Sequence, residues 1–163
     1  MTEQVVARQN SAWQQAGKIL LPALTAALCA AGIAIPLMFI PAAVCGGAWY
    51  WFFRHSDAEF EYTFFDGVLD IAVVYRKTYR KELLSVRAGD TVYFGSAAGP
   101  DAARYLNGRG KIWRCDSARP DAASYCLAFP ASGTSGTDAL LFEPNAELVT
   151  ALRRRIPRTA WRA

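Results

Sequence analysis

One uncharged run, Ile19–Phe53, dominates the hydrophobic pattern of the chain and lies between Lys18 and Arg54. A single straight helix over these roughly 35 positions would be about 50 Å long. The hydrocarbon core of a bilayer is about 30 Å thick, and about 20 residues cross it. The run therefore predicts two short spans folded back on each other.

Two prolines mark the place where this run turns. Pro36 and Pro41 each remove a backbone donor and clash with the preceding turn of a helix, so they disfavour a continuous helix. We expect a first leg over about Lys18–Ile35, with Pro22 in its first turn. The second leg covers about Leu37–Phe53. A re-entrant wedge that does not fully cross is the alternative.

Small and aromatic residues add detail to this hairpin. The small residues let helices approach closely in lipid, and they are Ala23, Ala26, Ala27, Ala30, Ala31, Gly32, Ala42, Ala43, Gly46 and Gly47. Trp49, Tyr50 and Trp51, followed by Arg54, predict an interfacial belt at the headgroups. A cleaved signal peptide has an apolar region of only 7–15 residues, so we expect this longer segment to be retained.

Residues 1–18 are mostly polar, and we expect an N-terminal cytoplasmic segment there. Val5, Val6 and Trp13 could form one face of a helix on the membrane surface, or they could belong to a frayed terminus.

The cations around the hairpin predict its orientation. Arg8 and Lys18 precede it and Arg54 follows it, whereas the turn Leu37–Ile40 has none. By the positive-inside rule, the protein lies in the cell membrane with both termini in the cytoplasm.

From Glu59 the hydrophobic period changes to two, which is typical of strands with one buried face. Phe60, Tyr62 and Phe64 alternate with polar residues, and Asp66-Gly67 then predicts a tight hairpin turn. Six more strands are expected over Val68–Tyr75, Tyr79–Val86, Thr91–Gly95, Lys111–Cys115, Tyr125–Phe129 and Ala139–Phe142. Gly99 to Gly108 predicts a loop or short helix, and Ser132–Gly136 a turn.

The last expected element is an amphipathic helix over about Asn145–Ile156, preceded by Pro144 and ended by Pro157. The fold class is a membrane α-helical hairpin plus an α+β domain. That domain is a pleckstrin-homology (PH)-like barrel of about seven antiparallel strands, closed by the C-terminal helix. The predicted divisions are 1–18, the hairpin 19–55 and the PH-like cytosolic domain 57–163.

The chain resembles a bacterial family of short membrane proteins with two N-terminal spans and a cytosolic PH-like domain of unknown function. The residues that carry the resemblance are Glu61–Phe64, Asp66–Ile71, Arg80–Leu84, Leu141–Asn145 and Arg155–Arg158. The resemblance covers nearly the whole chain and implies the fold and the membrane location. It implies no catalytic or ligand residues, and the chain departs from it in the Gly- and Ala-rich region Ser96–Gly110.

Charge and composition add few candidate functions. The net charge is +4 and the pI is about 9.0, but no basic run is interleaved with stacking aromatics, so we expect no nucleic-acid partner. Ten residues separate Cys115 from Cys126, without metal-ligand spacing, and we interpret the two as free thiols in a reducing compartment.

The sequence offers no catalytic device, so we expect no enzyme activity, no cofactor and no metal. Its only histidine, His55, lies at the expected membrane boundary. Gly108-x-Gly110-Lys111 lacks the spacing of a P-loop. Asp66 and Asp70 are explained by a turn and by the exposed face of a strand.

One group of cations remains as a candidate site: Arg76, Lys77, Arg80 and Lys81, around the turn between the second and third expected strands. Cations held near an anionic leaflet gain about 1 kcal/mol each, so these four could contact lipid. The alternative is a solvated strand edge.

Two functions follow from these predictions. The protein is a membrane-tethered, non-catalytic interaction module whose PH-like domain binds a protein partner or anionic lipid at the cytoplasmic face. Alternatively, it is a small accessory subunit of a larger membrane complex. Its partners would be the lipid bilayer and either another protein or further copies joined through the Gly/Ala-rich helices.

Overall fold

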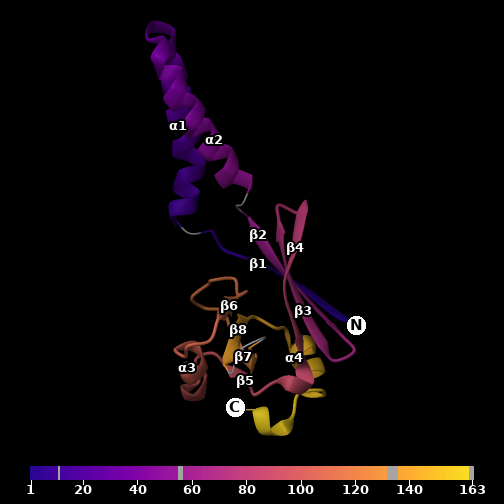
Figure 1. The fold of residues 1–163 in the computed structure, drawn as a ribbon. Helices are drawn as coiled ribbons and strands as arrows, with labels where there is room; N and C mark the ends of the chain where they lie inside the picture. Colours follow the sequence, from indigo (N-terminus) through magenta and orange to yellow (C-terminus); the bar gives the residue numbers. More distant parts are fainter. Residues whose placement is uncertain (11, 55–56, 132–135, 162–163) are drawn as a thin grey trace.

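The computed structural model describes residues 1–10, 12–54, 57–131 and 136–161. Two apolar helices, α1 (Ala12–Ala34) and α2 (Phe39–Arg54), form a hairpin at one end of the molecule (Figure 1). The short 3₁₀ turn η1 (Pro36–Met38) joins them, after Ile35 adopts an extended conformation. The break predicted at the prolines is therefore present.

The first helix is longer than predicted. It begins at Ala12, so Pro22 lies inside the helix and not in its first turn. The predicted start at Lys18 is wrong because the polar residues before Lys18 are also helical and extend the helix on the N-terminal side of the apolar run. At 1.5 Å per residue, α1 is about 34 Å long.

Small residues hold the two helices together. A Cβ atom on Gly32 would lie 3.0 Å from the Phe39 ring, and one on Gly17 would lie 3.2 Å from the Phe52 ring. The two helices are long and apolar enough to cross a membrane, and only 6% of each candidate span is buried inside the protein. Core helices of a soluble domain would be mostly covered, so these surfaces suit a lipid environment.

The first sheet, sheet A, has the order β1-β2-β3-β4, with all neighbours antiparallel. Its strands are β1 (Thr2–Ala7), β2 (Ala58–Phe65), β3 (Val68–Tyr75) and β4 (Tyr79–Arg87). β1 precedes the helical hairpin and pairs with β2, which follows it, in six register pairs from Thr2–Phe64 to Ala7–Glu59. The hairpin is therefore inserted between two neighbouring strands of one sheet.

This pairing corrects the prediction for the N-terminus. Val5 and Val6 lie on opposite faces of a strand, with Val6 buried and Val5 exposed, and they form no helical face. The strand forms because β2 offers a hydrogen-bonding edge that the local sequence does not reveal.

The second sheet, sheet B, has the order β5-β7-β8-β6. Its strands are β5 (Tyr93–Ser96), β6 (Ile112–Arg114), β7 (Tyr125–Pro130) and β8 (Thr137–Phe142), and the short helix α3 (Pro100–Leu106) follows β5. The predicted turn Ser132–Gly136 lies, up to Ser135, outside the described residues.

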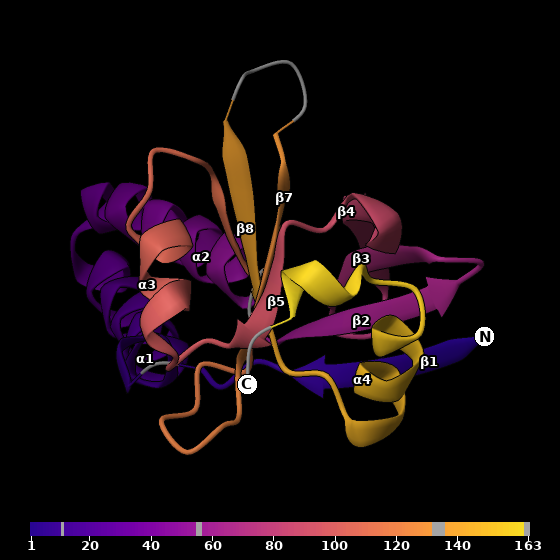
Figure 2. The same cartoon turned by 90° about the horizontal axis from the view of Figure 1, so that it is seen from below.

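The predicted closed barrel of seven antiparallel strands is wrong in two respects. The described residues form two separate four-stranded sheets, and β6 pairs with β8 in parallel. Closure is unnecessary for burying the core, because the two sheets and the C-terminal helix α4 (Ala146–Arg153) cover one another (Figure 2).

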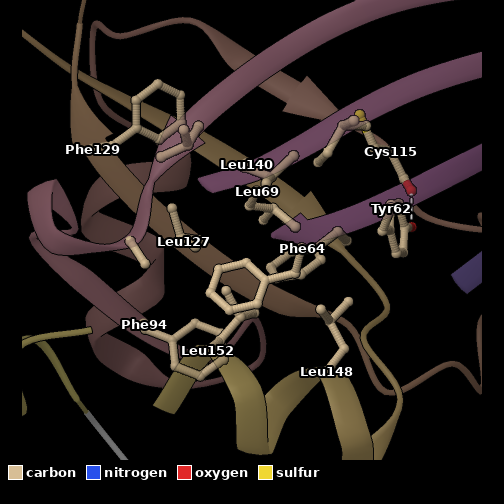
Figure 3. Packing of buried hydrophobic residues seen from close by; sticks show 14 of the residues in the cluster. Tyr62, Phe64, Leu69, Phe94, Cys115, Leu127, Phe129, Leu140, Leu148 and Leu152 are labelled. Carbon is tan, nitrogen blue, oxygen red and sulfur yellow. Dashed lines mark hydrogen bonds between the residues drawn. The ribbon is translucent and has the colours of Figure 1, made fainter. Parts of the chain in front are cut away.

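The core lies where these three parts meet (Figure 3). Sheet A contributes Tyr62, Phe64 and Leu69, and sheet B contributes residues such as Leu127 and Leu140. α4 adds Leu148 and Leu152, both fully buried. The Asn145 side chain accepts a hydrogen bond from the Leu148 N–H at 2.8 Å and caps the start of this helix.

A substitution within the hairpin tests its packing. We expect Gly32→Val to destabilise the helix pair by about 1–3 kcal/mol, because the added atoms overlap the Phe39 ring. Gly47→Val is the matched control, because a Cβ atom there meets nothing within 4 Å. Thermal unfolding in detergent measures both. Equal unfolding temperatures for the two variants would contradict the packing described above.

Candidate functional site

The base of the hairpin is held by one carboxylate. Asp57 Oδ1 accepts hydrogen bonds from Asn10 Nδ2 at 2.6 Å and from Lys18 Nζ at 2.7 Å. Asn10 precedes α1 and Asp57 follows α2, so this cluster joins the chain entering the hairpin to the chain leaving it. The Asp57 carbonyl oxygen also accepts a hydrogen bond from the Arg76 N–H at 3.1 Å, which ties the β3–β4 turn to the same point.

The β3–β4 turn has an unusual backbone for its sequence. Arg76 and Lys77 have φ values of 49° and 57°, and the Thr78 N–H donates to the Tyr75 carbonyl at 3.0 Å. Two consecutive positive φ angles are typical of a type I′ turn, for which Asn-Gly or Asp-Gly is the usual sequence. Long cationic side chains occupy this turn despite the strain that positive φ imposes on them.

The Arg76 side chain connects the turn to the apolar helix α2. Its guanidinium carbon lies 4.1 Å from the centre of the Phe53 ring, in the last turn of α2. A cation–π contact of this kind contributes about 0.5–1 kcal/mol when exposed and more when desolvated. Figure 1 shows the tip of the β3–β4 hairpin close to the lower end of α2.

The four predicted cations differ in whether they contact a partner within the protein. Arg76 contacts Phe53, and Arg80 Nε lies 2.7 Å from Glu61 Oε2, a hydrogen bond that raises the pKa of Arg80. Lys77 and Lys81 are exposed, and within the described residues no ion pair joins either to a carboxylate. These two ammonium groups are therefore the ones available to an external anion.

The residues of the predicted aromatic belt lie in the part of α2 that is close to the β3–β4 turn. Tyr50 and Trp51 are 60% and 65% exposed, whereas the Trp49 ring stacks on Phe53 at a centroid distance of 5.4 Å. Trp13, in the first turn of α1, is 87% exposed. Arg54 ends α2, and His55 lies outside the described residues.

A second polar cluster, which the sequence did not predict, ties the first strand to the last part of the chain. The Gln4 side chain donates to the Glu143 carbonyl at 2.8 Å and accepts from the Asn145 N–H at 2.7 Å. The Glu143 carboxylate accepts from both the N–H and the hydroxyl of Ser117, which is fully buried. These bonds fix β1 and the β8–α4 connection relative to each other.

Three buried titratable groups, Tyr62, Cys115 and Cys126, lie in the interior of the domain. The Tyr62 hydroxyl donates to the Cys115 carbonyl, and burial raises the pKa of Tyr62 well above its ordinary value. Burial likewise raises the pKa of Cys115 to about 12 and that of Cys126 to about 11. Both cysteines are free and buried, so neither resembles the exposed, low-pKa thiol of a reactive site.

The comparison with known families gives a result for the whole chain. The family "Bacterial PH-like domain (DUF6106)" matches residues 1–162. The chain belongs to this family. The match extends over β1 and the inserted hairpin as well as the two sheets. Neither a curated protein nor a solved structure matches the chain.

Two further features of the described residues concern metal and ligand binding. No group of three or more His, Cys, Asp or Glu side chains there could hold a metal ion. A surface depression of about 750 Å³ is open and lined by α3, the following glycine loop and the start of β8.

The buried tyrosine and cysteine predict alkaline instability. In the folded protein both groups stay protonated, whereas in the unfolded chain they ionise near their ordinary pKa values of 10.0 and 9.0. The free energy of unfolding should therefore be constant below about pH 9 and fall as the pH rises toward about 12. Denaturant unfolding at several pH values measures this. Cys115→Ala should reduce the slope between pH 9 and 10 by about half, because Cys126, whose pKa burial also raises, still contributes there. An unchanged slope in that variant would contradict the assignment.

Proposed function

We propose that this protein is a membrane-tethered, non-catalytic interaction module. Its PH-like domain lies at the cytoplasmic face of the membrane, contacts anionic lipid through the β3–β4 turn and presents its remaining surface to a protein partner. The observation that carries the proposal is the contact of Arg76 with Phe53, which positions the turn beside the last turn of α2.

The sheet topology supports placing both ends of the hairpin on one side of the membrane. β1 and β2 pair along six register positions, so the chain before α1 and the chain after α2 must be on the same side. Two crossings satisfy this requirement, and a cleaved leader would remove β1. Arg8, which precedes α1, and Lys18, which lies near the start of α1, favour the cytoplasm as that side.

The lipid contact rests mainly on Lys77 and Lys81. A cation near an anionic leaflet gains about 1 kcal/mol, and it does so only when no carboxylate already neutralises it. Arg76 and Arg80 have partners within the protein, so they position the turn, whereas the two lysines meet the headgroups.

The exposed alanines of α1 support the alternative, an accessory subunit of a larger membrane complex. Ala23, Ala27, Ala30 and Ala34 all point away from α2 and are exposed. A small-residue surface lets a further helix, from another protein or a second copy, pack closely in lipid.

Charge reversal tests the lipid contact in the full chain, because removing residues 1–56 would delete β1 from the sheet. A fluorophore at Thr78→Cys, with Cys29 and Cys45 replaced, reports the environment of the turn in nanodiscs. We expect phosphatidylglycerol, but not phosphatidylcholine, to protect it from an aqueous quencher. Lys77→Glu with Lys81→Glu should abolish the difference between the two lipids.

Arg154→Glu with Arg155→Glu is the matched control, because these residues directly follow α4, which lies far from the hairpin (Figure 1). This control should behave like the parent protein. The lipid contact is excluded if both double variants retain the same protection.

Cysteine labelling in intact cells tests the membrane topology. Cys115 is only 1% exposed, so the reporters are introduced at two exposed positions, Leu37 in the hairpin turn and Asp121 in the β6–β7 loop. An impermeant reagent should label Leu37→Cys before lysis and Asp121→Cys only afterwards. Labelling of Asp121→Cys before lysis would invert the topology, and labelling of Leu37→Cys only after lysis would indicate a re-entrant hairpin.

A further inference from the structure

The outer edge of β1 is a regular, unpaired strand edge. The Arg8 N–H donates to the Ala58 carbonyl at 2.9 Å, which fixes the phase of the ladder: even-numbered residues of β1 bond to β2. Glu3, Val5 and Ala7 therefore direct their N–H and C=O groups away from sheet A. Within the described residues no backbone group pairs with these three. Figure 2 shows β1 at the margin of sheet A.

This open edge has defined ends. The Gln9 N–H donates to the Ser117 carbonyl at 2.8 Å, and the Gln4 side chain is bonded to the β8–α4 connection. Beside the edge lies an open groove of about 470 Å³, lined by Gln4–Gln9 with Arg119 and Glu143. The bonds at Gln4 and Gln9 fix β1 in place, and Glu3, Val5 and Ala7 are exposed.

The two edges of sheet A differ in how they are protected. The β4 edge carries Arg80, Lys81 and Glu82, and its register with β3 is broken by an irregularity at Ile71/Ala72. Charges and bulges are the usual means by which proteins prevent edge-to-edge pairing. The β1 edge has a continuous register and no proline, it carries a single charged residue, Glu3, and it exposes 59% of Val5.

We propose that β1 pairs antiparallel with β1 of a second copy of this chain, with the two-fold axis at Val5. Val5 then lies opposite Val5 of the second copy, and Glu3 lies opposite Ala7. These pairs join only residues whose backbone groups point outward, so about six hydrogen bonds form without disturbing the bonds to β2. The pairing buries Val5 and places no like charges opposite each other.

The arrangement is compatible with two copies in one membrane. A two-fold axis perpendicular to a sheet rotates the second copy within the plane of the sheet. Each face of the sheet therefore points in the same direction in both copies. In Figure 1 the helical hairpin and α4 lie on opposite sides of β1, so both hairpins leave the joined sheet in the same direction. Seven residues separate Val5 from Ala12, so the hairpins stand up to about 45 Å apart. A dimer formed through β1 therefore differs from a dimer formed through the alanines of α1, in which the hairpins would contact each other.

Disulfide cross-linking of the full chain in native membranes tests the pairing, with Cys29 and Cys45 replaced. Opposite residues of a hydrogen-bonded pair have Cα atoms about 5.5 Å apart, within disulfide range. Oxidation should convert Val5→Cys into a covalent dimer. Ala7→Cys is the matched control, because its two copies would lie roughly 13 Å apart and should not cross-link. A mixture of Glu3→Cys and Ala7→Cys should cross-link between the two variants.

A backbone substitution separates specific pairing from chance collision. Val5→Pro removes an N–H that points away from β2, so the fold should persist as it does at edge strands generally. We expect its dimer dissociation constant in nanodiscs to rise at least about tenfold relative to Val5→Thr, which keeps the N–H.

Three results would overturn the proposal. Equal cross-linking at positions 5 and 7 would indicate collisions. A monomer in nanodiscs at every concentration would exclude the pair. Protection of Val5→Cys from thiol reagents in native membranes, without a homodimeric disulfide, would show that another protein covers this edge.

Discussion

The pairing of β1 with β2 is the constraint on which the rest of the structure depends. These strands are neighbours in the sheet, yet residues 8–57 lie between them in sequence. The intervening segment must bring the chain back to the point at which it left the sheet. A helical hairpin does so because its two legs are antiparallel, and small residues such as Gly32 let the legs pack together. In effect, the apolar hairpin is a long loop of sheet A.

Polar contacts add to the constraint that this pairing imposes on the chain. Asp57 joins the two ends of the hairpin, and Gln4 joins the first strand to the connection between β8 and α4. The N-terminal strand therefore contacts both the element that follows the hairpin and the last helix of the chain. The domain is consequently not the continuous segment 57–163 alone, since its sheet needs a strand from before the hairpin.

The sequence predicts the parts of the fold that depend on local pattern. The hairpin follows from an uncharged run with two prolines, and β2 to β8 follow from alternation, with bounds close to those observed. β1 could not be predicted because its short, polar segment becomes a strand only beside β2. The parallel pairing of β6 with β8 is equally a matter of tertiary arrangement. At the candidate site, the sequence predicts where the four cations cluster. It cannot predict that Phe53 and Glu61 engage two of them, because those contacts cross from one element to another.

A comparison of the two tight turns of sheet A shows which one is shaped by folding alone. The β2–β3 turn uses Asp66-Gly67, both at positive φ, and this sequence suits the required backbone. The β3–β4 turn imposes positive φ on Arg76 and Lys77, for which the same backbone is strained. Asp-Gly in that place would relieve the strain but would lose the contact with Phe53 and a free cation at the base of the hairpin. Because sequences break local rules mainly where a site requires it, the strain in this turn supports the lipid contact proposed for it.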